Sequence, residues 1–171
     1  AGLLAMLTGM GSLSYGELAG ERMKLGLMLN DPEEEQDCFS DNTHNSHYHD
    51  GLGIRNVYLG SYTRVDGSVV EGPSLSDLVA AADPAVDAQL RAELDASVAA
   101  LGSVKAAAEG GLAYDQMLAP GSDEGERLIM GAVTALVAQT ASIERAVLVL
   151  GLSVTGFEGS DSLDNPNAVF Q

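Results

Sequence analysis

The chain lacks tryptophan, has only 5% aromatic residues and contains one cysteine, Cys38. Scarce aromatics argue against a β-sandwich or barrel, because strands favour aromatic and β-branched side chains. A single cysteine cannot form an internal disulfide, so it does not reveal the redox compartment, and we expect Cys38 to be a small buried apolar side chain. Alanine, leucine, valine and glycine dominate instead. This composition predicts an all-α fold of closely packed helices.

Basic residues are also scarce, with 8 Lys and Arg against 25 Asp and Glu and a net charge of −17. Such a surface repels phosphate backbones and anionic membranes, so we expect no nucleic acid partner. It concentrates cations, although solubility is the commoner reason for an acidic surface. Acidic residues therefore indicate a site only where they cluster.

Helix signals are clearest after residue 73. Ser74 and Asp77 form a capping-box pair, and Asp83-Pro84 supplies an N-cap followed by proline at the first helical position. The expected helices are 1–30, 74–82, 84–109, 112–118 and 122–151. Their short connections predict an up-and-down helical bundle over residues 1–151, with a tail over 152–171 that packs on it.

The first expected helix is rich in glycine, and each glycine weakens a helix by roughly 1 kcal/mol relative to alanine. So many glycines suggest that another segment approaches the helix backbone. Gly16 and Gly20 have the spacing that would let a second helix lie against this face, while a kink or break near residues 9–16 is the alternative. Because the chain opens at Ala1 inside this helix, we expect a fragment or a processed form of a longer protein.

Residues 31–73 show no sustained helical period and predict a long loop after the first helix. Within it, Arg55–Tyr62 fits a short strand or a turn. Loops of this length are uncommon in compact domains and tend to be functional or disordered. This loop contains aromatic side chains as well as the aliphatic residues Ile54 and Val57, so we expect it to be ordered and functional.

All three histidines, His44, His47 and His49, lie within six positions of this loop and follow a run of acids. Asp41, His44 and His47 are spaced three residues apart, so one helical turn would bring them to one side. Imidazole combined with carboxylate suits zinc, copper or iron. The pattern H-x-x-H-x-H matches no tight metal motif, so a loop with incidental surface histidines is an equal alternative.

Two carboxylates on the first helix, Glu17 and Glu21, share one face, where like charges repel unless a cation intervenes. Solvated surface charges are the plainer interpretation of this pair. The sequence contains no H-E-x-x-H, G-x-S-x-G, P-loop or G-x-G-x-x-G motif. A Cys38 nucleophile with His44 as its base is rejected, because acids beside a thiol oppose formation of the thiolate.

Five segments stand out in order along the chain: 9–23 (GMGSLSYGELAGERM), 33–44 (EEEQDCFSDNTH), 52–60 (LGIRNVYLG), 72–79 (GPSLSDLV) and 156–170 (GFEGSDSLDNPNAVF). Together they resemble imelysin-like proteins, and in particular an iron-regulated branch of that family. The segments extend along nearly the whole chain. The resemblance is therefore specific.

The resemblance implies an all-helical protein built from two bundle halves, of which this chain corresponds to the second. It further implies a protein of the periplasm or outer membrane of a Gram-negative bacterium, associated with iron acquisition, in a family first described as metallopeptidases. The family's G-x-H-x-x-E motif belongs to the first half and does not occur in this chain. The implied partners are that first half, an iron or haem-type ligand, or other envelope proteins.

Glu21 and Arg22 match the family's E-R pair, and residues 40–44 match its S-D-N-T-H segment. Relatives commonly carry a histidine where this chain has Gln36, and His47 and His49 fall outside the family pattern. The resulting hypothesis is a site shared between two halves. Its members in this chain are the metal ligands Glu21, Asp41 and His44 for iron, zinc or copper, the ligand-binding residues Arg22, Ser40 and Asn42, and the weaker candidates Glu17, His47 and His49.

Two functions from other classes stay open. A zinc-type peptidase would use a metal-bound water and a glutamate base, and it needs at least three protein ligands, more than this chain supplies alone. An interaction module without metal predicts that chelation changes neither stability nor binding.

Overall fold

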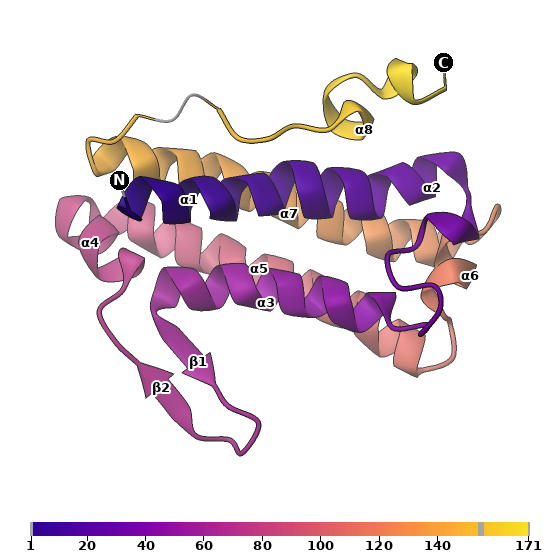
Figure 1. Ribbon diagram of the computed structural model, residues 1–171, viewed down its shortest axis with the longest axis horizontal. Coiled ribbons are helices and arrows are strands. Elements are labelled where there is room, and N and C mark those ends of the chain that lie inside the picture. The colour runs from indigo at the N-terminus through magenta and orange to yellow at the C-terminus, as the bar shows by residue number, and fades with distance from the viewer. Residues whose placement is uncertain (1, 154–155, 171) are drawn as a thin grey trace.

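The computed structural model describes residues 2–153 and 156–170 and confirms the all-α bundle (Figure 1). Four long rods follow one another in alternating directions: the continuous α1–η1–α2 (Gly2–Ser12, Leu13–Lys24, Leu25–Leu29), α3 (Thr43–Leu59), α5 (Pro84–Glu109) and α7 (Asp123–Val149). The short helices are η2 (Pro32–Glu34), α4 (Leu75–Ala82), α6 (Tyr114–Leu118), α8 (Asp161–Asp164) and η3 (Pro166–Phe170). Ala1, expected inside the first helix, lies outside the described residues, as do residues 154–155 and 171 of the expected tail.

The prediction of a long loop over 31–73 is wrong for residues 43–59, which form a helix. Helix α3 occupies Thr43–Leu59, and a hairpin of β1 (Ser61–Thr63) and β2 (Val69–Glu71) follows it, so the strand near Arg55–Tyr62 begins only at Ser61. The helix escaped prediction because few of its inward side chains are apolar. The buried residues of α3 are Thr43, His47, Gly51, Ile54 and Tyr58.

The capping signals after residue 73 are confirmed. The Ser74 hydroxyl accepts from the Asp77 N–H at 2.9 Å, and the Asp77 carboxylate accepts from the Ser74 N–H at 3.0 Å. The Asp83 carboxylate accepts from two N–H groups in the first turn of α5. These bonds satisfy amides that a helix start leaves without partners, which is why sequence located both starts.

The first rod has no break at its glycines. Its middle, η1, is a π-helix, and the Leu25 N–H that follows it donates to the carbonyl of Gly20 five residues earlier. π-Helical turns are rare and are frequent at functional sites. The wider turn brings residues five apart onto one face, and this governs how the polar residues of η1 are used.

The core consists of two apolar clusters separated by a polar layer. One contains Leu18, Leu101, Ile129 and Leu136 among others, and the other contains Leu7, Leu94 and Ile143 among others. Between them, the buried side chains Ser14, Ser97, Gln139 and Thr140 bond to one another. Ser14 and Thr140 also donate to the Leu136 carbonyl, so the layer joins η1, α5 and α7 through satisfied hydrogen bonds.

Helix α7 packs at the centre of the bundle against α5 and η1. It is the one described helix with the length and apolar composition to cross a membrane, and half of that apolar stretch is buried inside the protein. The core helix of a bundle has the same composition, so α7 is accounted for by its packing.

The tail from residue 156 onward reverses the direction of α7 and lies along the first rod, running in the same direction as that rod (Figure 1). Phe157 lies over Gly11, the carbonyl of Glu158 lies over Gly16, and Ser160 lies over Gly20. The expected close approach at Gly16 and Gly20 is present, but the neighbour at Gly16 is the extended segment, and the neighbour at Gly20 is the start of the short helix α8, through Ser160 and Leu163. The tail comes this close because the glycines carry no Cβ, and it is held by hydrogen bonds from the Ser162 hydroxyl to the Gly20 carbonyl and from the Glu158 N–H to the Ser12 hydroxyl.

Candidate functional site

Arg22 of η1 stands between two carboxylates. Its Nη2 and Nε donate to Glu17 Oε1 at 2.7 and 3.0 Å, and its Nη1 donates to Asp50 Oδ2 of α3 at 2.8 Å. The π turn explains the first pair, because Glu17 and Arg22 are five residues apart. Burial raises the pKa of Asp50, although the Arg22 charge and hydrogen bond act in the other direction. Arg22, predicted to bind a ligand, thus binds two carboxylates of its own chain.

The acid-rich segment before α3 is fastened to the start of that helix. The buried Thr43 hydroxyl donates to Glu35 Oε2 at 2.9 Å and accepts from the Asp37 N–H at 2.9 Å. The Ser46 hydroxyl donates to the Asp37 carboxylate. Burial raises the pKa of Glu35, and the Thr43 hydrogen bond opposes that shift. These bonds give the loop one conformation.

The imidazole of His47 is buried without a hydrogen bond to any described residue. It is 1% exposed, and neither ring nitrogen has a hydrogen bond within the described residues. Its ring meets that of Tyr114 of α6 edge to face, with centroids 5.0 Å apart. The Tyr114 hydroxyl is also buried and has no hydrogen-bond partner over residues 2–153 and 156–170. Burial, followed by the positive charge of Arg22, lowers the pKa of His47 to about 3. His47 is therefore a neutral core side chain at physiological pH.

The remaining predicted residues separate into two places. Ser40, Asp41 and Asn42 are exposed in the turn that enters α3. His44 in its first turn is half-buried, with Nε2 3.1 Å from the Asn45 amide nitrogen and with a buried Nδ1 that bonds to none of the described residues. Glu21 instead accepts a 2.5 Å hydrogen bond from Ser160 of the tail. Glu21 thus binds the tail segment and lies in a different cluster from the α3 turn.

Asp41 has the backbone conformation that most favours a functional explanation. Its φ is +48°, a left-handed value that a residue other than glycine rarely adopts. Such strain costs on the order of 1 kcal/mol and gathers at ligand-binding and catalytic positions. Among the described residues, however, no three His, Cys, Asp or Glu side chains form a group that could hold a metal ion.

Cys38 contradicts its prediction, since it is exposed and not a buried apolar side chain. The next residue, Phe39, is fully exposed as well. The hydrogen bonds of Glu35, Asp37 and Thr43 hold this turn on the outside of the bundle, which leaves both side chains in solvent. Sequence reasoning relied on the usual burial of cysteine and could not see that constraint.

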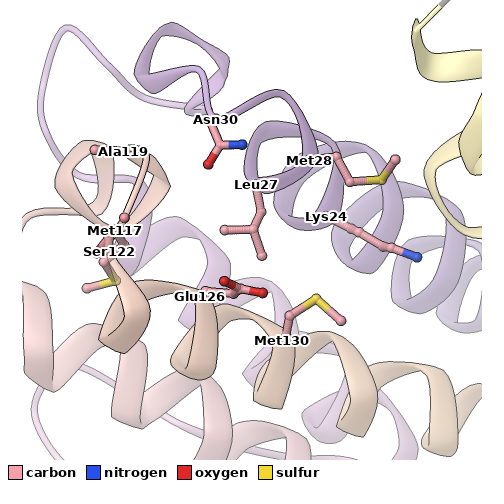
Figure 2. A pocket seen from close by; sticks show the side chains of 10 residues that line it. Lys24, Leu27, Met28, Asn30, Met117, Ala119, Ser122, Glu126 and Met130 are labelled. Carbon is pink, nitrogen blue, oxygen red and sulfur yellow. The ribbon is translucent and has the colours of Figure 1, made fainter.

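Two surface hollows lie away from the candidate metal ligands Asp41 and His44. One of 280 Å³ lies where α2 meets α6 and the start of α7, and Figure 2 shows Leu27 and Glu126 pointing toward one another across it. None of the predicted site residues lines it. A larger cleft of 690 Å³ lies between α3 and the hairpin and includes His49 in its wall.

Two buried tyrosines test whether the Tyr114 hydroxyl lacks a hydrogen bond, with the hydrogen-bonded Tyr58 as the comparison. Tyr58→Phe removes a hydroxyl that donates to the buried Asp87 carboxylate at 2.8 Å, so we expect the free energy of unfolding to fall by about 2 kcal/mol. Tyr114→Phe removes a hydroxyl without a partner, so stability should stay equal or rise by up to about 1 kcal/mol. Urea unfolding at pH 7 measures both. An equal loss in the two variants would show that the Tyr114 hydroxyl is hydrogen-bonded in solution.

Comparison with known proteins matches the chain to one protein family. Residues 1–143 match the family model described as imelysin, which is labelled peptidase M75. No curated protein matches the chain. The matched region includes η1, the acid-rich turn and α3, and therefore every residue of the candidate site.

Proposed function

The chain belongs to the imelysin family, and from this premise we propose that it serves bacterial iron acquisition by binding a metal ion or a metal-bearing ligand. We place the protein in the iron-regulated branch, in the periplasm or at the outer membrane. Asp41 and His44 supply a carboxylate and an imidazole, a combination that suits iron, zinc or copper. The rest of the site comes from the other bundle half, with Arg22, Ser40 and Asn42 near the bound group.

The observation that carries this proposal is the turn that enters α3. Asp41 is exposed and has a positive φ, and three positions later the buried Nδ1 of His44 has no hydrogen-bond partner in the described part of the chain. The positive end of the α3 dipole opposes a cation here. Five acids within residues 33–41 offset it, namely Glu33, Glu34, Glu35, Asp37 and Asp41.

The proposal is tested on the full-length protein by calorimetric titration with Fe(II), Zn(II) and Cu(II). Loss of a ligand in His44→Ala or Asp41→Ala should weaken the affinity for the physiological metal at least about tenfold. Glu33→Ala removes an exposed acid from the same segment and is the matched control, with affinity expected to stay within twofold. Unchanged affinity for all three metals in His44→Ala would sink the assignment.

A zinc-type peptidase is the second candidate, because the family model is itself labelled a peptidase. A zinc ion held by Asp41, His44 and ligands of the other bundle half would activate a water for peptide hydrolysis, and a glutamate would serve as the general base. Incubation of the full-length protein with an unfolded polypeptide, with and without chelator, separates the two functions. Chelator-sensitive cleavage supports the peptidase, and metal binding without cleavage supports iron acquisition.

A further inference from the structure

The hairpin follows the end of α3 and extends away from the bundle (Figure 1). Between it and α3 lies an apolar cleft whose lining does not include Asp41 or His44. Leu52 and Val57 line it from α3, and Tyr62 and Val70 line it from the hairpin. Glu71 of the hairpin also lines it, and its carboxylate accepts from the Ser61 hydroxyl at 3.5 Å. Tyr62 and Val70 are cross-strand partners, so their side chains lie on the same face of the hairpin. The volume of 690 Å³ lies within the range of roughly 300–1,000 Å³ that small-molecule pockets occupy.

The two apolar walls line one cleft without closing it. Val57, Tyr62 and Val70 remain 48%, 53% and 42% exposed, although packing them together would remove apolar surface from water. The hairpin is held in its open position at its base, where Gly60 ends α3 at a φ of +60° and its carbonyl accepts from the Gly72 N–H at 3.0 Å. The cleft is therefore preformed and does not result from a loose hairpin.

The next hollow, which has a volume of 320 Å³, shares His49, Leu52 and Tyr62 with the cleft and carries arginine side chains. Arg64 and Arg55 line it, and Arg55 is paired with Asp95 at 2.6 Å. Arg64 makes no ion pair with any described residue, in a protein with a net charge of −17. An unpaired guanidinium beside an apolar cleft is complementary to a molecule with an apolar body and an anionic end.

We propose that the cleft between α3 and the hairpin binds an apolar carboxylic acid. The apolar body lies between Leu52 and Val57 on one side and Tyr62 and Val70 on the other, and the carboxylate reaches Arg64 past His49. This site is independent of the metal site at Asp41 and His44, so either can fail without the other.

Gly53 supplies the sharpest test. It lines the cleft from α3, and a Cβ placed on it meets no atom within 4 Å. Gly53→Leu therefore fills the cleft, and it also favours the helix, so that lost binding cannot be attributed to unfolding. Arg64→Ala removes the cation, and Arg145→Ala, an exposed arginine of α7, is its matched control.

Calorimetric titration of the full-length protein uses decanoate, with decanol as the uncharged analogue. We expect Gly53→Leu to weaken both ligands at least about tenfold, since it occupies their volume. Arg64→Ala should weaken decanoate about threefold and leave decanol unchanged, as for an exposed charge pair, while Arg145→Ala changes neither. Absence of decanoate binding, or equal affinity in Gly53→Leu, would overturn the proposal. Self-association that Gly53→Leu abolishes, without decanoate binding, would overturn it in favour of a protein interface.

Discussion

At acidic pH, His47 is expected to cost the folded protein on the order of 5 kcal/mol of stability. Burial lowers its folded pKa from 6.5 to about 3, so the folded imidazole stays neutral where the unfolded chain takes up a proton. Each pKa unit corresponds to about 1.4 kcal/mol. The contribution is absent above about pH 6.5, and stability is lost progressively as the pH falls toward 3.

The charged groups around His47 do not reverse the direction of its pKa shift, which remains downward. Arg22 and His44 disfavour the protonated ring, and Asp37 favours it only partly, because burial is the largest cause of the shift. Glu35 and Asp50 act in the opposite direction, since burial raises their pKa values. Their folded carboxyls take up protons at higher pH than in the unfolded chain, and stability increases as the pH falls through those pKa values.

A comparison of variants isolates His47 from the carboxyls. His47→Leu removes the titration and keeps an apolar group beside Tyr114, so its stability should decline less between pH 7 and pH 4 than that of the natural protein. Urea unfolding at one-unit pH steps measures the difference. His49→Ala, which replaces an exposed histidine of the same helix, is the control for the substitution itself. Parallel curves for His47→Leu and the natural protein would show that the folded imidazole is solvated or hydrogen-bonded.

The fold was predictable where local chemistry marks helix ends, and it was missed where the inward face is not apolar. Caps at Ser74 and Asp83 located α4 and α5. In α3 the residues that face the core recur at three- and four-residue steps, as in any packed helix, but a hydropathy pattern registers only Ile54 and Tyr58 among them. Gly51 is there because Leu101 of α5 lies directly over it.

The site was predictable only in part, because its contacts depend on the whole bundle. The sequence singled out Arg22 and the acid-rich segment, but the Glu17 pair needs a π turn and the Asp50 pair needs α3 beside η1. Tyr114 is 67 positions after His47 along the chain, so no local pattern joins them. Metal binding at Asp41 and His44 stays a prediction.

Two glycines of the first rod, Gly9 and Gly16, should change the free energy of unfolding in opposite directions when each is replaced by alanine. This pair tests how the tail is held. Gly16→Ala places a Cβ 2.5 Å from the carbonyl oxygen of Glu158, a backbone atom that cannot rotate away. Gly9→Ala, on the same rod, meets nothing within 4 Å. Alanine should therefore stabilise the protein by roughly 1 kcal/mol at position 9, through helix propensity alone.

At position 16 we expect alanine to lower the free energy of unfolding by about 3 kcal/mol, because the tail must move and its hydrogen bonds are lost. Those bonds include Ser160 to Glu21 at 2.5 Å, Ser162 to the Gly20 carbonyl at 3.0 Å and Tyr15 to Asp164 at 2.7 Å. Urea unfolding measures both variants, and limited proteolysis reports whether the tail after residue 156 becomes cleavable in Gly16→Ala. If both variants gain stability equally, the tail does not lie on the glycines in solution, and Glu21 is then free to take the ligand role that its sequence position suggested.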